Sequence, residues 1–283
     1  MTSFELKVGE RLRTGVFDTP SSDLSCVAVL IVLHGTLQRG LLVRRITRFA
    51  DFAPRSGVKV LFPDALGGYW RDGLRPDDDV DDVQFIAELV RHIRREPGCA
   101  GVPVFIAGVS NGGFMVQRLL CEHPDLFAAA AVVIATMGLN QHLLCVPRSV
   151  VPLCLIAGTA DPIVAHAGGL MRLRAAGGFG ATNARILGFA EMVDHWRTLG
   201  GFAPEWGETR AIDGGERSLR EARYAAVAGE GLWTMEVVGG GHHWFGYPID
   251  PAYEHGFGPT SLEFDTTRYI WTFFSRALGA CRT

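Results

Sequence analysis

Continuous apolar runs alternate along this chain with segments in which apolar residues recur at helical spacing. Apolar runs that are rich in β-branched residues are typical of strands buried on both faces of a sheet. Such runs predict strands at Cys26 to Leu33, Val58 to Phe62, Val104 to Val109, Phe127 to Ile134 and Val151 to Ala157. Alternation of apolar and polar residues predicts a further strand at Leu232 to Val238.

Amphipathic segments separate these runs and predict helices. They lie at Arg44 to Arg55, from Asp81 to Ile93, directly after Ser110, at Ile186 to Leu199 and at Thr266 to Leu278. The acidic residues Asp77, Asp78, Asp79, Asp81 and Asp82 are interpreted as a helix N-terminus rather than a metal site, because Asp suits the cap and faces the positive end of the helix dipole. Strands that alternate with helices predict an α/β fold, with a mostly parallel central sheet and helices on both faces.

The remaining segments complete a single predicted domain. Residues 4–17 alternate weakly and predict an edge hairpin, and residues 18–25 a polar turn. The segment 200–231 is rich in Gly, Ala and charge and is expected to form loops with a hairpin rather than a second domain. With 283 residues and 48% hydrophobic content, the chain suits one α/β domain over residues 1–283.

Charge and composition exclude several classes of partner. The net charge of −3 does not suggest a polyanion, so no nucleic-acid partner is expected. The longest apolar run, Phe127 to Leu139, is too short to span a bilayer, and no membrane association is expected. The N-terminus carries Glu5 and Glu10 and does not resemble a secretory leader, which favours a cytoplasmic, reducing location.

The six cysteines show no C-x-x-C pair and no zinc-like spacing. Cys26 and Cys154 fall in apolar strands, where buried thiols are expected. The adjacent His242 and His243 are not expected to bind a metal, because neighbouring side chains diverge and no H-E-x-x-H motif accompanies them. The sequence therefore predicts neither a metal nor another cofactor.

The candidate chemistry centres on Ser110, which lies in the G-x-S-x-G pattern between a predicted strand and a predicted helix. A sharp strand-to-helix turn would push the serine hydroxyl out above the sheet, and the flanking glycines would let the two backbones pass closely. A glycine-rich connection without chemistry is the alternative interpretation of this pattern. Ser110 is predicted to be a nucleophile because suitable partners follow it along the chain.

Asp161 and His242 follow the ends of two later predicted strands. The order Ser110, Asp161, His242 is the order of nucleophile, acid and histidine in α/β-hydrolases. Loops at the carboxyl ends of parallel strands meet at one sheet edge, so these residues are expected to converge. Taken singly, Asp161 could be a turn residue before Pro162 and His242 a packing residue. Only one of His242 and His243 can face Ser110, and the first residue after the glycines is the better placed.

Further candidates lie in the loops around these positions. The backbone N–H of Asn111 and that of Thr36, after His34-Gly35, are predicted to form an oxyanion hole. Tyr69 and Trp70 follow the strand Val58 to Phe62 and are candidates for substrate contact, although they could instead pin their loop down. His34 and Trp244 are further candidates for substrate binding.

Several colinear motifs make the chain resemble a known family. The motifs are Leu33-His34-Gly35, Phe62-Pro63-Asp64 with Trp70, Asp81-Asp82-Val83, Gly108 to Met115, Pro124 to Ala129, Gly158 to Val164, and Gly239-Gly240-Gly241-His242 with Trp244. From about residue 26 to 278, the chain resembles the polyhydroxybutyrate depolymerase/feruloyl esterase family of α/β-hydrolase serine esterases. The resemblance implies ester hydrolysis without a cofactor, with Ser110, Asp161 and His242 as the triad.

The chain also departs from that family. Gly201-Phe202 stand where family members often have Gly-Cys, and Phe245 stands where many have proline. Many members are secreted, which leaves the compartment open. The predicted substrate is a small or medium ester, with hydroxyalkanoate oligomers, feruloyl or other aryl esters and acetyl esters as candidates. The alternatives are a serine peptidase on the same fold and a non-catalytic binding domain with a relic site.

Overall fold

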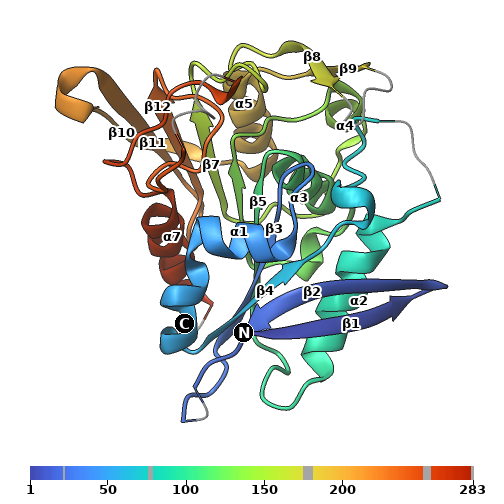
Figure 1. Ribbon diagram of the computed structural model, residues 1–283. Helices are drawn as coiled ribbons and strands as arrows, with labels where there is room; N and C mark the ends of the chain where they lie inside the picture. The colour runs from blue at the N-terminus through green and yellow to red at the C-terminus, as the bar shows by residue number, and fades with distance from the viewer. Residues whose placement is uncertain (22, 76–78, 175–180, 251–255, 282–283) are drawn as a thin grey trace.

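A ten-stranded sheet forms the centre of the protein in the computed structural model, which describes all residues except 22, 76–78, 175–180, 251–255, 282 and 283 (Figure 1). The strand order is β1-β2-β4-β3-β5-β6-β7-β12-β11-β10. These strands are β1 (Thr2–Val8), β2 (Arg11–Asp18), β3 (Ala28–Leu33), β4 (Val58–Pro63), β5 (Val104–Val109), β6 (Ala129–Val133), β7 (Leu153–Gly158), β10 (Ala203–Ile212), β11 (Arg217–Ala225) and β12 (Leu232–Val238).

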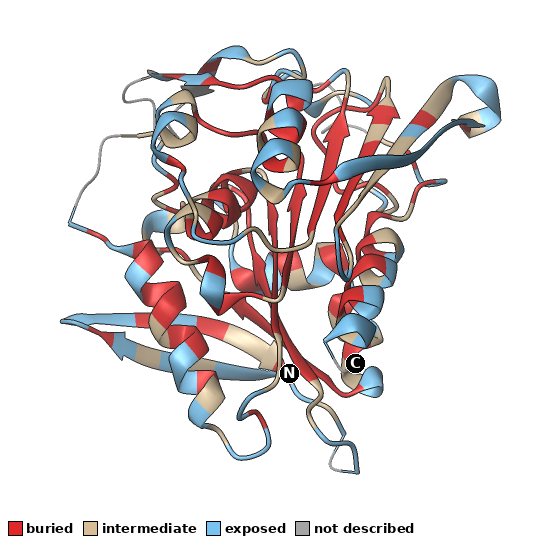
Figure 2. Ribbon diagram, turned by 180° about the vertical axis from the view of Figure 1, so that it is seen from behind, coloured by how far each residue is buried: buried red, intermediate tan, exposed pale blue. Residues whose placement is uncertain are grey.

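The middle of the sheet, from β4 to β12, is parallel. At each end of the sheet lies an antiparallel hairpin, β1–β2 on one side and β10–β11 on the other. Strands β3 to β7 are buried along their whole length, as their continuous apolar sequences predict (Figure 2). The edge hairpin predicted at residues 4–17 is confirmed as β1 and β2.

Helices cover both faces of this sheet. They are α1 (Gly40–Thr47), α2 (Asp82–Arg95), α3 (Asn111–Glu122), α4 (Leu139–Leu144), α5 (Phe189–Gly200) and α7 (Thr266–Ala280), with single 3₁₀ turns at Phe49–Asp51, Ala53–Ser56, Leu66–Gly68, Pro124–Leu126 and Asp213–Gly215. One hydrophobic core lies under α2, α3 and α5, and the other lies under α1 and α7. The predicted α/β fold with helices on both faces is confirmed. Among the described helices, none is long and apolar enough to cross a membrane.

Two predicted segments differ from the structure. The helix expected at Arg44 to Arg55 begins at Gly40 and ends at Thr47, because Arg48 adopts a left-handed conformation and Pro54 cannot continue a helix without losing a hydrogen bond. The segment 200–231 does contain a hairpin, but the expectation of loops was wrong. Its strands β10 and β11 are long, and β11 pairs with β12 to extend the main sheet.

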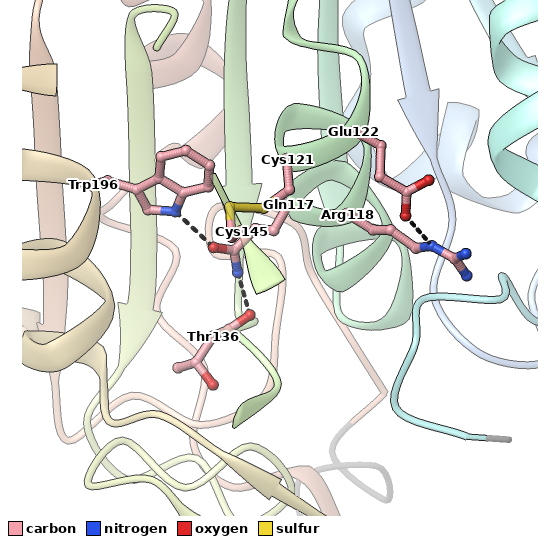
Figure 3. The surroundings of a disulfide bond; sticks show 7 residues. All are labelled: Gln117, Arg118, Cys121, Glu122, Thr136, Cys145 and Trp196. Carbon is pink, nitrogen blue, oxygen red and sulfur yellow. Dashed lines mark hydrogen bonds and ion pairs between the residues drawn. A yellow bond between two sulfur atoms is a disulfide. The ribbon is translucent and has the colours of Figure 1, made fainter. Parts of the chain in front are cut away.

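Other features were not foreseen from the sequence. A small separate hairpin is formed by β8 (Gly169–Arg174) and β9 (Ala181–Ile186). A disulfide joins Cys121 of α3 to Cys145 directly after α4 (Figure 3). Cys154 is a buried free thiol, as expected, whereas Cys26 is free but only half-buried. Asp81 caps α2 by accepting a hydrogen bond from the Gln84 N–H, whereas Asp77 and Asp78 lie outside the described residues.

Candidate active site

Ser110 lies in the tight turn between β5 and α3, as the G-x-S-x-G pattern predicts. Its backbone has φ 54° and ψ −121°, an unusual conformation for a residue with a side chain. Hydrogen bonds fix the turn on both sides, from the Ser110 N–H to the Val133 carbonyl (2.9 Å) and from the Phe114 N–H to the Ser110 carbonyl (3.0 Å). A Cβ on Gly108 would lie 2.2 Å from the Gly112 carbonyl oxygen, so the close passage of strand and helix requires glycine there.

The structure brings Ser110, Asp161 and His242 together at the carboxyl edge of the sheet. His242 Nε2 lies 2.9 Å from Ser110 Oγ, and His242 Nδ1 lies 2.6 Å from Asp161 Oδ2. The three residues follow β5, β7 and β12, which lie in the parallel middle of the sheet, so side chains that are far apart in sequence meet at one edge. In this arrangement Nδ1–H donates to the carboxylate, which leaves Nε2 free to accept the serine proton.

Backbone contacts hold the acid and the histidine in place. Asp161 Oδ1 accepts hydrogen bonds from the N–H groups of Ile163 and Val164, both at 2.8 Å. The His242 N–H donates to the Phe257 carbonyl (2.5 Å), and a Cβ on Gly241 would lie 2.2 Å from that same carbonyl oxygen. His243 faces elsewhere, because its Nε2–H donates to the Gly258 carbonyl at 2.6 Å.

Two backbone N–H groups lie near Ser110 as candidate oxyanion donors. Asn111 is the first residue of α3, where N–H groups have no partner within the helix. Among the described residues, neither the Asn111 N–H nor the Thr36 N–H has a hydrogen-bond acceptor. The loop that carries Thr36 lies against Ser110, since a Cβ on Gly35 would be 3.5 Å from the Ser110 Cβ.

Some of the known proteins that are similar to this chain are esterases. No protein-family model matches the chain. The chain is 28% identical over 233 residues to "Putative esterase NocK" of Nocardia uniformis subsp. tsuyamanensis, across 78% of this chain and 67% of that protein. It is 30% identical over 132 residues to feruloyl esterase B of Piromyces equi, across 44% of this chain and 24% of that protein.

Solved structures share the fold. A thermostable esterase superposes with a TM-score of 0.55 at 15% identity, over 98% of this chain and 61% of that one. Acetyl xylan esterase from Aspergillus awamori superposes with a TM-score of 0.59 at 15% identity, over 90% of this chain and 97% of that one.

The chain has the α/β-hydrolase fold and is distantly related to esterases. This confirms the family resemblance inferred from the motifs at the level of fold and esterase type, through distant homology. The match spans about a quarter of feruloyl esterase B, so the substrate in that protein's name is not carried over to this chain.

Three of the predicted substrate contacts have buried side chains that do not line the cavity at Ser110. Trp70 is fully buried, its Nε1–H donates to the His34 carbonyl (3.0 Å), and its ring stacks on Phe85. His34 is also fully buried; its Nδ1–H donates to the Gly35 carbonyl, and its Nε2 accepts the Ala65 N–H. Burial lowers the pKa of His34, which keeps this ring neutral.

Trp244 is the third of these residues. It is buried against Phe49, and its Nε1–H donates to Thr267 Oγ1 at 2.9 Å. An indole in a loop can pack either inward or outward, and the sequence pattern does not distinguish the two. Tyr69 remains a candidate contact, because it lines the cavity beside Ser110.

The cavity at Ser110 is small, with a volume of about 20 Å³. Its wall includes Tyr69, Asp72, Leu74, Phe114 and Val164. Sequence reasoning missed Asp72, although an acidic residue in the loop after β4 stands at the same sheet edge as the nucleophile. It also missed the Asn111 side chain, whose amide hydrogen-bonds to Trp70 and Asp72.

Proposed function

We propose that this protein is an esterase that hydrolyses carboxylic esters through an acyl-enzyme formed on Ser110. His242 takes the proton of the Ser110 hydroxyl as the oxygen attacks the ester carbonyl, and Asp161 stabilises the resulting imidazolium. The N–H groups of Asn111 and Thr36 hold the developing oxyanion. The intermediate then collapses, and the alcohol leaves with the proton from His242. Water activated by His242 next attacks the acyl-enzyme and releases the acid.

The observation that carries this proposal is the hydrogen-bonded chain from Ser110 Oγ through the His242 ring to Asp161 Oδ2. A serine hydroxyl becomes a nucleophile when a base lies within hydrogen-bond reach and that base is itself oriented by a third group. The separations of 2.9 Å and 2.6 Å meet both conditions. A non-catalytic domain with a relic site would not need this alignment.

The test is replacement of the nucleophile. In Ser110→Ala, kcat on a p-nitrophenyl ester is expected to fall by about 10⁴–10⁶, because the members of a triad act as a unit. Labelling by a fluorophosphonate should disappear as well. The control is Ser56→Ala, which alters an exposed serine before β4 and should keep both activity and labelling. Full turnover by folded Ser110→Ala would overturn the proposal.

The small cavity favours a short acyl group. A volume of about 20 Å³ leaves little room beyond one water-sized group, which needs about 10–15 Å³. Among the candidate substrates, acetyl esters therefore fit better than long-chain or bulky aryl acids. We expect kcat/KM for p-nitrophenyl acetate to exceed that for the octanoate by about tenfold or more. A preference for octanoate would mean that the acyl chain lies elsewhere.

A serine peptidase on the same fold remains the second candidate, because the same alignment also attacks amides. Peptide hydrolysis needs strong binding of the chain on both sides of the scissile bond, and the small cavity offers little area for that. Model peptides assayed beside the esters distinguish the two activities. Peptide turnover at rates similar to those of the esters would favour the peptidase.

A further inference from the structure

A buried carboxylate outside the proposed triad lies in the wall of the nucleophile cavity. Asp72 is 4% exposed, and its Oδ1 accepts the Leu74 N–H at 3.0 Å. Among the described residues, no basic side chain lies within ion-pair distance of it, and the charge of Arg75 only partly offsets its burial. Burial raises the pKa of Asp72 to about 6, so the ionised form is costly to keep in this place. Because a buried, ionised carboxylate lowers the stability of the fold, we looked for a role of Asp72 in the reaction.

Asp72 also contacts the Asn111 side chain, next to Ser110. Its Oδ2 accepts a hydrogen bond from the Asn111 Nδ2 at 2.7 Å. The Asn111 amide also accepts the Trp70 N–H (2.6 Å) and donates to the Trp70 carbonyl (3.0 Å). The Trp70 N–H can only donate, so Oδ1 must face it and Nδ2 must face the carboxylate. Asn111 is thus held by three hydrogen bonds, and Asp72 provides the only charged partner among them.

The same loop also holds the second candidate oxyanion donor. The Trp70 Nε1–H donates to the His34 carbonyl, and the Leu37 N–H donates to the Gly68 carbonyl at 2.6 Å. Thr36 lies between these two attachment points. The loop from residue 65 to residue 74 therefore connects the Asn111 side of the oxyanion hole with the Thr36 side.

We propose that Asp72 is a positioning residue, whose buried carboxylate holds the Asn111 side chain and thereby fixes the Asn111 backbone N–H as an oxyanion donor. This inference rests on the proposed function, because it assigns a task within that reaction. A donor must lie within about 0.5 Å of its productive place to stabilise a transition state. Loss of the carboxylate should let Asn111 rotate and weaken the transition state more than the bound ester.

The experiment compares Asp72→Ala and Asp72→Asn with wild type on a short-chain p-nitrophenyl ester. In Asp72→Ala, kcat should fall about 30- to 100-fold, somewhat less than for complete loss of an oxyanion donor, with KM within about threefold. The inhibition constant of a trifluoromethyl ketone, which forms an oxyanion on the serine, should rise by a similar factor. Asp72→Asn should lose only about 3- to 10-fold in kcat, because its amide can still accept one of the two hydrogen bonds.

The matched control is Asp18→Asn. Asp18 is a buried aspartate of β2 that accepts hydrogen bonds from Arg44, on the edge hairpin and outside the cavity. Its loss should lower the melting temperature and leave kcat unchanged. If Asp72→Ala does not fold, the nearly isosteric Asp72→Asn tests the inference instead. The inference then requires that the kcat of Asp72→Asn and its affinity for the inhibitor fall together.

Three results would overturn the inference. They are an unchanged kcat in a folded Asp72 variant, a loss confined to KM, and a loss of kcat that vanishes when the assay is cooled well below the melting temperature. The first would leave Asp72 without a role in the reaction. The second would make it a substrate contact, and the third would make it structural. A fully active Ser110→Ala is a different failure, since it would refute the proposed function before Asp72 is tested.

Discussion

At the scale of single residues, the adjacent histidines give a clear test of the site. His242 lies between Ser110 and Asp161, whereas the Nε2–H of His243 donates to the Gly258 carbonyl. The kcat/KM of His242→Ala should therefore fall to nearly the background value of Ser110→Ala. His243→Ala should stay within about tenfold of wild type in kcat/KM, or roughly 1.4 kcal/mol, and lose some thermal stability. Collapse in His243→Ala with near-normal turnover in His242→Ala would reverse the two roles.

Asp72 also predicts a dependence of stability on pH. Its pKa in the fold is about 6, above the ordinary value of 3.8, so the folded state binds this proton more tightly than the unfolded state. The ionised carboxylate therefore destabilises the fold by about 3 kcal/mol above pH 6. This cost shrinks as the pH falls from 6 to 3.8 and is absent below that range.

Asp72→Asn removes this ionisation. The melting temperature of the variant, relative to wild type, should be highest at pH 7–8 and should decline steadily as the pH is lowered toward 4. Thermal unfolding monitored by circular dichroism across this range measures the difference. A difference that does not change with pH would show that the carboxyl group is not buried in its charged form.

At the scale of elements, the sequence predicted best those strands that are buried on both faces of the sheet. The strands β3 to β7 are apolar throughout, and the turn at Ser110 follows from glycines at fixed positions, so fold and candidate triad could be predicted. The structure of segments with mixed composition could not be predicted in this way. The exposed, charged strand β10 is held by its pairing with β11, and β11 in turn pairs with β12. The inward packing of Trp70 likewise depends on Phe85 and His34, which are distant in sequence.

The disulfide between Cys121 and Cys145 joins α3, the helix that begins after Ser110, to the end of α4. Next to it, Gln117 of α3 accepts a hydrogen bond from Trp196 and donates to the Thr136 carbonyl (Figure 3). The bond closes a sequence separation of 24 residues, for which loop entropy predicts a stabilisation of about 3 kcal/mol. The double variant Cys121→Ser/Cys145→Ser should thus melt several degrees lower, with kcat at 25 °C little changed because Ser110 lies at the other end of α3.

The control for this prediction is Cys281→Ser, which removes an exposed free thiol and should leave the melting temperature unchanged. Wild type treated with a reductant should melt like the double variant. An equal melting temperature with and without reductant would mean that the bond does not form in solution. Disulfides persist mainly in oxidising compartments, so a formed bond would favour export over the cytoplasmic location expected from the N-terminus.

At the scale of the whole molecule, the sheet couples the site to the rest of the chain. The proposed triad is delivered by β5, β7 and β12, and β12 also pairs with the hairpin β10–β11 at one end of the sheet. Hydrophobic cores under both helical layers share the strands between them. Displacement of any central strand would therefore disturb both cores and the alignment of Ser110 with His242.

This coupling predicts that residues 1–283 unfold as one domain. In differential scanning calorimetry we expect a single transition, with a ratio of calorimetric to van't Hoff enthalpy of about 1. Esterase activity should be lost at the same temperature as the circular dichroism signal, because the site has no separate scaffold. Two resolved transitions, or activity lost well before the main transition, would instead indicate that part of the chain, such as the hairpin β10–β11, unfolds independently of the catalytic edge.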